Sequence, residues 1–217
     1  EVGCIGYVYS YGMSSNDPHG TNYEITYTDG SPTESYATLP SNPTHIFDTT
    51  SCGTTAITPT ETITNHFQIV VSGTNGCNTT GTFVTVGPMA VSSPTSPSFD
   101  VNPGNTVCQN SELLVNNTSF SGEEVTEFSC SQLYGKYWTV TPINGAPSNG
   151  YTLTNGDLGD SQGTSYYLAW NNGSDDIGLT FNEPGEYVIT LTTGNTCSVE
   201  EISDTIYNLA SEKNSYI

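Results

Sequence analysis

The sequence predicts an all-β protein made of two tandem antiparallel β-sandwiches. Short runs of β-branched and aromatic residues alternate with polar residues along the 217-residue chain, and Gly- or Asn-containing turns separate them every 8–12 residues or so. The 14 Tyr, seven Phe and two Trp supply apolar surface for a core, so we do not expect a disordered chain despite the polar composition. Similar segments recur in both halves, which indicates a tandem repeat.

Alternation of apolar and polar residues gives the individual strands. In the run N-Y-E-I-T-Y-T, for example, Tyr23, Ile25 and Tyr27 fall on one face. The expected strands cover 22–28, 67–71, 82–86, 112–115, 137–140, 166–170, 178–181, 186–192 and 204–209. Turn dipeptides such as Asp29-Gly30 and Pro184-Gly185 punctuate them.

A Pro- and Ser-rich segment divides the chain. It reads G-P-M-A-V-S-S-P-T-S-P over 87–97, which is typical of a short, stiff linker. We therefore expect one sandwich over 1–87, a linker over 88–97 and a second sandwich over 98–210. Residues 211–217 are interpreted as a tail or the start of a further repeat, in a chain that reads as a segment of something longer.

The charge balance excludes several functions. The chain has 22 acidic residues, two Lys and no Arg, for a net charge of -20. Nucleic acids and anionic lipids require Lys or Arg, so neither is an expected partner. No apolar run approaches the roughly 20 residues of a membrane span, so membrane insertion is not expected. The acidic excess favours solubility and repulsion between neighbouring domains.

Six cysteines indicate structural disulfides. None forms a C-x-x-C pair, and an even number in a Thr- and Asn-rich chain favours an extracellular location. They are Cys4, Cys52, Cys77, Cys108, Cys130 and Cys197.

The repeat can be aligned on two of these cysteines. Placing Asn75-Gly76-Cys77 over Asn195-Thr196-Cys197 puts the preceding aromatic and β-branched strands in register. Cys4 and Cys108 each open their half, and the segment 27–30 (Y-T-D-G) is matched with 170–173 (W-N-N-G).

These residues resemble the PKD (polycystic kidney disease) family. The segment 182–191 (N-E-P-G-E-Y-V-I-T-L) is similar to the family's P-G-x-Y-x-V-x-L stretch. The segment 25–32 (I-T-Y-T-D-G-S-P) resembles the W-x-F-G-D-G-S motif, from which Tyr27 and Thr28 depart, and 44–47 (T-H-I-F) resembles the strand after it. In the second half, 170–173 is a degenerate version of the Asp-Gly motif. The resemblance implies an immunoglobulin-like sandwich over nearly the whole chain.

The Cys-bearing, Thr/Asn-rich style is also similar to PKD arrays in giant surface adhesins of Bacteroidota, of the SprB-like gliding-motility type. That resemblance implies display at the outer membrane and a non-enzymatic role as a disulfide-stabilised spacer or adhesion module. Implied partners are neighbouring repeats of the same chain and a surface polysaccharide or another cell-surface protein. The implied topology favours pairing Cys4 with Cys52 and Cys130 with Cys197, and leaves Cys77 and Cys108 open.

Calcium is the one cofactor that the sequence suggests. Asp157 and Asp160 lie in N-G-D-L-G-D, and Asp175 and Asp176 lie in N-N-G-S-D-D. These loops, together with the turn at Asp29, offer the oxygen ligands that calcium prefers, although none matches an EF-hand. The alternative is that these residues are solvated turn residues.

An enzyme is not expected, because no G-x-S-x-G setting or cleft-facing pair of carboxylates is evident. Two alternatives stay open: a glycan-binding accessory module of a secreted enzyme, and a subunit of an extracellular filament. The aromatics expected to contact glycans are Tyr7, Tyr9, Tyr11 and Tyr134. Candidate glycosylation positions are Asn78, Asn117, Asn172, Thr49 and Thr205.

Overall fold

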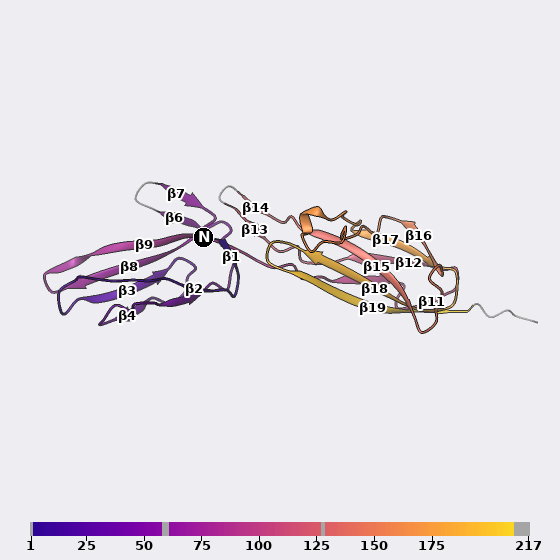
Figure 1. Cartoon of the computed structure of the whole chain (residues 1–217), viewed down its shortest axis with the longest axis horizontal. Coiled ribbons are helices and arrows are strands. Elements are labelled where there is room, and N and C mark those ends of the chain that lie inside the picture. The colour runs from indigo at the N-terminus through magenta and orange to yellow at the C-terminus, as the bar shows by residue number, and fades with distance from the viewer. Residues whose placement is uncertain (1, 58–60, 127–128, 211–217) are drawn as a thin grey trace, which may run out of the picture. The chain divides into compact units, whose positions relative to one another are not determined.

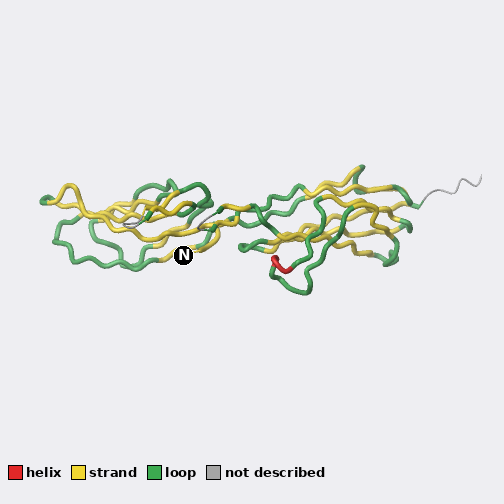
Figure 2. The backbone as a smooth tube through the Cα atoms, turned by 90° about the horizontal axis from the view of Figure 1, so that it is seen from above, coloured by secondary structure: helices red, strands yellow, loops and turns green. Residues whose placement is uncertain are grey.

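A computed structural model describes residues 2–57, 61–126 and 129–210 of the chain. The chain divides into two compact units. Unit 1 comprises Glu1–Ser93 and Glu123–Gln132, and unit 2 comprises Pro94–Gly122 and Leu133–Ile217. Figures 1 and 2 show strands and loops in both units, with one short 3-10 helix among the described residues.

Unit 1 is built on one five-stranded sheet and three two-stranded ladders. The five-stranded sheet has the order β1 (Val2–Cys4), β9 (Asn78–Ser92), β8 (Phe67–Asn75), β3 (Asn22–Tyr27) and β4 (Glu34–Tyr36). The ladders pair β2 (Val8–Ser10) with β5 (Thr44–Ile46), β6 (Thr55–Ile57) with β7 (Thr62–Thr64), and β13 (Glu124–Val125) with β14 (Cys130–Ser131).

Alternating buried and exposed side chains along the strands form the core of unit 1. Strand β3 buries Tyr23, Ile25 and Tyr27, as its period of two predicts, and they face inward beside Phe67 and Ile69 of β8. Aromatic rings fill much of this core. The Phe47 ring stacks on the Phe67 ring at 4.9 Å between centroids.

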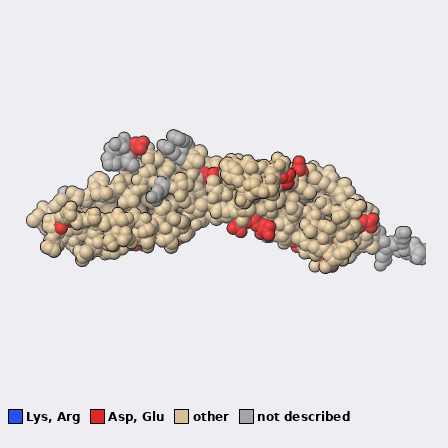
Figure 3. Space-filling view, viewed as in Figure 1, with Lys and Arg blue, Asp and Glu red and all other residues tan. Residues whose placement is uncertain are grey.

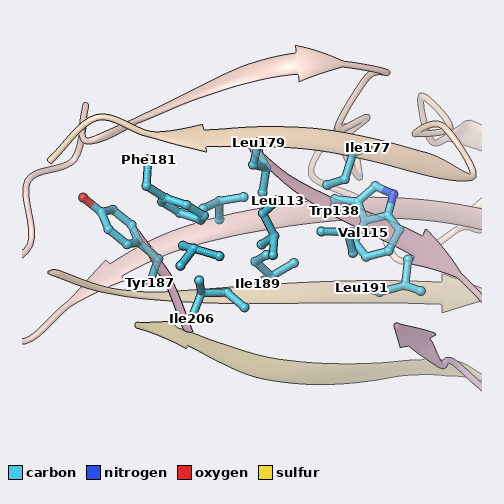
Figure 4. Packing of buried hydrophobic residues seen from close by; sticks show 12 residues of the cluster. Leu113, Val115, Trp138, Ile177, Leu179, Phe181, Tyr187, Ile189, Leu191 and Ile206 are labelled. Carbon is cyan, nitrogen blue, oxygen red and sulfur yellow. The ribbon is translucent and has the colours of Figure 1, made fainter. Parts of the chain in front are cut away.

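Unit 2 consists of two four-stranded sheets packed face to face. One sheet has the order β10 (Phe99–Asn102), β12 (Glu112–Asn117), β17 (Asp176–Phe181) and β16 (Tyr151–Asn155). The other has the order β11 (Thr106–Cys108), β19 (Val199–Leu209), β18 (Gly185–Gly194) and β15 (Gly135–Ile143). Figure 4 shows Leu113 and Leu179 of the first sheet facing Ile189 and Leu191 of the second.

Two features of unit 2 are typical of immunoglobulin-like sandwiches. Trp138 of β15 is buried in the core at 1% exposure. Tyr187, near the start of β18, donates a hydrogen bond from its hydroxyl to the Glu183 carbonyl at 2.9 Å, which is the geometry of a tyrosine corner. The all-β, tandem immunoglobulin-like fold class is therefore confirmed.

Most expected strands are present, but the one over 166–170 is wrong. Tyr167–Ala169 form the 3-10 helix η1, and no strand pairs with it. The Trp170 indole N–H instead donates to the Thr164 carbonyl at 2.8 Å, and the ring packs edge-on against Tyr137 at 5.0 Å. Tyr167 and Trp170 are buried in this local arrangement, whereas Tyr166 is exposed.

The alignment of 27–30 with 170–173 is also wrong. Strand β3, which precedes Asp29, pairs with β8, whereas the strand in the corresponding position of unit 2 is β15, which pairs with β18. The segment 170–173 follows η1 and precedes β17. The two Gly-containing turns therefore occupy different places in the fold.

The domain boundaries differ from the expectation in two ways. Strand β9 continues to Ser92 through the first part of the expected linker, because a bulge at 87–88 accommodates Pro88 before β9 pairs with β1. The hairpin of β13 and β14, expected in the second sandwich, belongs to unit 1. Residues 211–217 lie outside the described residues.

Candidate functional site

A disulfide between Cys52 and Cys130 fastens this hairpin within unit 1. The sulfur atoms are 2.00 Å apart and the Cα atoms 5.8 Å apart, across a sequence separation of 78 residues. Cys52 lies in the turn before β6 and Cys130 opens β14. The bond joins two segments that the sequence places in different halves of the chain.

Hydrogen bonds hold the same hairpin beside the end of β9. The backbone N–H of Glu123 donates to the Ser93 hydroxyl at 2.8 Å, and the Ser93 N–H donates to the Glu123 carbonyl at 2.9 Å. The Val125 N–H donates to the Ser92 hydroxyl at 2.9 Å, and the Thr50 hydroxyl donates to the Glu123 carboxylate. Val125 itself is buried at 3% exposure. The hairpin is therefore an integral part of unit 1.

The expected disulfide pairing is wrong at these positions. Cys52 bonds to Cys130 rather than to Cys4, and so Cys130 does not bond to Cys197. Cys4 and Cys197 are both in disulfide linkage. Cys77 and Cys108 are exposed free thiols, so neither forms a disulfide within this chain.

The reason for the wrong pairing is the hairpin of β13 and β14. The prediction placed Cys130 in a loop of the second sandwich, where Cys52 could not reach it. The S-C-S segment around Cys130 carries no sequence signal that assigns it to unit 1. Pairing requires Cα atoms within about 7 Å, and proximity of this kind depends on the tertiary fold.

A polar cluster around Lys136 gathers four of the predicted site residues in unit 2. The Lys136 ammonium lies 2.8 Å from the Asp175 carboxylate and 5.0 Å from the centroid of the Tyr134 ring. The Tyr134 hydroxyl accepts a hydrogen bond from the Asn117 amide at 2.9 Å, and the Lys136 backbone N–H donates to the Asn172 side-chain oxygen at 3.0 Å. The hydrogen bond from Lys136 lowers the pKa of Asp175. The cluster thus brings together a predicted calcium ligand, a predicted glycan-contact residue and two predicted glycosylation positions. Their contacts with one another and with Lys136 form an ion pair and the hydrogen bonds around it.

A second polar cluster lies in unit 1 at Asp29. Its carboxylate contacts the His45 ring nitrogen at 2.8 Å and accepts hydrogen bonds from the Ser31 N–H at 2.9 Å and the Ser31 hydroxyl at 3.0 Å. Burial alone would raise the pKa of Asp29, but these hydrogen bonds outweigh it and the pKa is lowered. The His45 ring stacks on Tyr27 at 3.6 Å between centroids. The D-G-S turn and the T-H-I-F strand are thus joined by one side-chain contact.

Two of the remaining calcium-ligand candidates accept hydrogen bonds from backbone N–H groups within their own turns. The Asp157 carboxylate accepts the Gly159 N–H at 2.9 Å, and the Asp160 carboxylate accepts the Gln162 N–H at 2.7 Å. Asp176 is exposed at the start of β17. Within the described ranges, no group of three or more His, Cys, Asp or Glu side chains is placed to hold a metal ion. Calcium binding stays a prediction.

The three alternating tyrosines near the N-terminus, Tyr7, Tyr9 and Tyr11, lie in different environments. Tyr7 is exposed, at 62%, whereas Tyr9 is buried at 5% and packs against Phe47 at 5.1 Å between centroids. The Tyr11 hydroxyl lies 3.3 Å from the Tyr27 hydroxyl. The assignment of Tyr9 as a glycan-contact residue is therefore wrong. Tyr9 is the middle residue of the short strand β2 (Val8–Ser10), and its side chain is buried while those of its two neighbours are exposed.

The candidate glycosylation positions differ in accessibility. Asn78 and Thr49 are exposed, and Thr205 is half-buried. The amide of Asn117 and the side-chain oxygen of Asn172 are already engaged in the Lys136 cluster. Modification at Asn117 would require its amide to leave Tyr134, so Asn78 and Thr49 are the more accessible positions.

Figure 3 shows the acidic side chains of one face in small, separate groups on a surface that is otherwise uncharged. No helix in the described part of the chain is long and apolar enough to cross a membrane.

Comparisons with known proteins complete the description. No family model matches the chain, and no curated protein matches it. Solved structures with similar folds include domains 4 and 5 of the S-layer protein SbsC (14% identity, TM-score 0.30, 68% of this chain and 67% of that one). An I-band fragment of titin gives 10% identity and a TM-score of 0.37 over 97% of this chain and 62% of the fragment. The insect immune protein hemolin gives 11% identity and a TM-score of 0.44, and the matched part spans 44% of its length.

Proposed function

We propose that this chain is a non-enzymatic, load-bearing spacer segment of an extracellular surface protein. The observation that carries the proposal is the Cys52–Cys130 disulfide, which holds Glu123–Gln132 in unit 1 although the flanking chain belongs to unit 2. The backbone therefore passes from one unit to the other after Ser93, after Gly122 and after Gln132.

These crossings change how the chain carries tension. A disulfide between residues 52 and 130 gives the load a covalent path that bypasses the 78-residue separation between them. The bypassed segment contains β8 and β9 of unit 1 and β10 to β12 of unit 2. Strand pairs that lie wholly within this segment, such as β8 with β9 and β10 with β12, are not peeled apart by pulling on the chain ends, which suits a spacer under tension.

The surface and the compartment agree with this role. Disulfides persist in oxidising, extracellular environments. A net charge of -20 keeps like domains apart and soluble. The narrower assignment to a SprB-like gliding adhesin of Bacteroidota belongs to this proposal and rests on the sequence resemblance alone.

Single-molecule stretching tests the load path. Cys4 and Cys197 are replaced by Ser, so that Cys52–Cys130 is the disulfide under test, and this C4S/C197S protein is compared with C4S/C197S/C52S/C130S. At roughly 3.6 Å per extended residue, opening the 78-residue separation should release about 280 Å of additional contour length in the second protein. Equal contour lengths in the two proteins would refute the load path.

The full-length coding sequence tests the finer assignment. Many further domains of this type favour a surface adhesin, whereas one hydrolase domain beside two such units favours the accessory-module alternative.

A further inference from the structure

The two free cysteines occupy positions that are oxidised in the other unit. Cys77 and Cys197 lie in hairpins that join two long neighbouring strands, β8 to β9 in unit 1 and β18 to β19 in unit 2. In each hairpin the cysteine N–H donates to the side-chain oxygen of the Asn two residues earlier, at 2.9 Å in both cases. We call these two residues hairpin cysteines.

Cys4 and Cys108 are equivalent in the same sense. Each ends a short strand, β1 or β11, that pairs in parallel with the second strand of the hairpin in its own unit, β9 or β19. In both cases the next backbone N–H donates to a carbonyl of that second strand, at 2.9 Å and 2.8 Å. The N–H three residues on donates to the cysteine's own carbonyl, at 3.1 Å and 3.0 Å. We call these two residues first-strand cysteines.

One cysteine of each kind is oxidised and one is free. Cys4 and Cys197 are in disulfide linkage, which shows that both positions of this fold form disulfides. Cys108 and Cys77 are exposed thiols at the matching positions. The free pair therefore consists of one first-strand cysteine and one hairpin cysteine, each with the local backbone geometry of its oxidised counterpart.

We propose that Cys77 and Cys108 are intermolecular disulfide sites, and that Cys77 of one copy of this chain bonds to Cys108 of a second copy. Such a contact uses two different surfaces, so it is heterologous and can continue from copy to copy. The inference rests on the proposed extracellular role, because that role supplies the oxidising compartment.

The chemistry requires a disulfide oxidant such as glutathione disulfide. The Cys77 thiolate attacks one sulfur of the oxidant, forms a mixed disulfide and releases one thiolate. The Cys108 thiolate of the second copy then attacks the Cys77 sulfur and releases the second thiolate. Two protein thiols are oxidised and one oxidant disulfide is reduced to two thiols.

Mixing two single variants tests this pairing. C77S, labelled with ¹⁵N, and unlabelled C108S are combined in equal amounts in a glutathione redox buffer, and intact masses of the disulfide-linked dimers are measured. We expect heterodimer in several-fold excess over the random outcome, in which it is only twice as abundant as either homodimer. The unmodified protein should form a ladder of oligomers that dithiothreitol collapses, and C77S/C108S should stay monomeric.

Four outcomes would overturn the proposal: a random mixture, predominant homodimers, an internal Cys77–Cys108 bond within the monomer, or monomers that carry only glutathione. The load-path test is performed independently of it, because C77S/C108S can serve as the background for every stretching measurement. If the unmodified protein forms no disulfide-linked oligomers but the two stretched proteins differ in contour length, only this inference is refuted. Equal contour lengths in the stretching experiment refute the proposed function.

Discussion

Removing the Cys52–Cys130 disulfide should destabilise unit 1 and leave unit 2 nearly unchanged. The bond closes a loop with a sequence separation of 78 residues. The chain-entropy relation for a loop of this length gives about 4.5 kcal/mol of stabilisation at 25 °C. If Pro94–Gly122 stays folded in unit 2, the flexible part of the loop is shorter. Because the entropy depends on the logarithm of the length, the value then falls by only a few tenths of a kcal/mol or so.

The two tryptophans make the assay specific. Both of them, Trp138 and Trp170, belong to unit 2, so tryptophan fluorescence reports the unfolding of unit 2 alone. Far-UV circular dichroism follows both units. In urea, C52S/C130S should lose about 2–4 kcal/mol in the transition that fluorescence does not detect, since measured disulfide contributions usually fall in that range.

The matched control is C77S/C108S, measured on monomeric protein, which removes two exposed thiols and no disulfide within the chain. Its two transitions should coincide with those of the unmodified protein to within about 0.5 kcal/mol. The reasoning fails if C52S/C130S loses less than about 1 kcal/mol, or if its fluorescence transition shifts as much as the other one.

Four further substitutions test the clusters described above. Asp29→Asn should destabilise unit 1 by about 1.5–3 kcal/mol at pH 7, the usual value of a hydrogen bond to a charged group. Because the pKa of folded Asp29 is lowered, this contribution is present above the ordinary aspartate pKa of about 3.9 and is lost as the pH falls through the folded value. The difference between the variant and the parent in urea titrations should therefore shrink as the pH is lowered below the ordinary aspartate pKa. Tyr187→Phe should cost unit 2 about 1 kcal/mol by tryptophan fluorescence, through loss of the tyrosine-corner hydrogen bond. Gly150→Ala should cost more, about 1–3 kcal/mol, because a Cβ there would lie 2.0 Å from the Tyr187 hydroxyl; equal effects of these two variants would contradict this explanation. Lys136→Met should change stability by less than about 1 kcal/mol, because the Asp175 side chain that it pairs with is 72% exposed; a larger loss in the urea midpoint would show that the cluster is a more important support.

The parts of the fold that follow from local pattern were predictable from sequence. The alternation in β3 and the strand that follows Pro184 depend only on neighbouring residues, and both are present where they were expected. The Asn-x-Cys alignment was also informative, because an Asx-type hydrogen bond is set by a spacing of two residues.

Features that depend on long-range contact were not predictable in this way. The segment 166–170 has strand-like residues but no partner strand, and burial of Trp170 by a local turn decides its conformation. The Lys136 cluster joins side chains from separate loops and strands, and nothing in their spacing indicates that they meet. The same is true of Cys52 and Cys130, since a bond across 78 residues is determined by tertiary structure.

The hairpin also decides where the molecule can be divided. A fragment ending at Ser93 would retain both strands of the β8–β9 pair but would lose β13, β14 and Cys130. It would expose Ser92 and Ser93, whose hydroxyls accept hydrogen bonds from the hairpin, and it would leave Cys52 as a free thiol. We therefore expect a 1–93 fragment to be less stable than unit 1 in the whole chain by at least the roughly 2–4 kcal/mol expected for the disulfide. Adding a synthetic peptide covering 123–132 under oxidising conditions should restore part of that loss, whereas the same peptide with Cys130→Ser should restore less. Identical urea midpoints for the fragment with and without the oxidised peptide would show that unit 1 is complete at Ser93, and that the hairpin is held by unit 1 without supporting it.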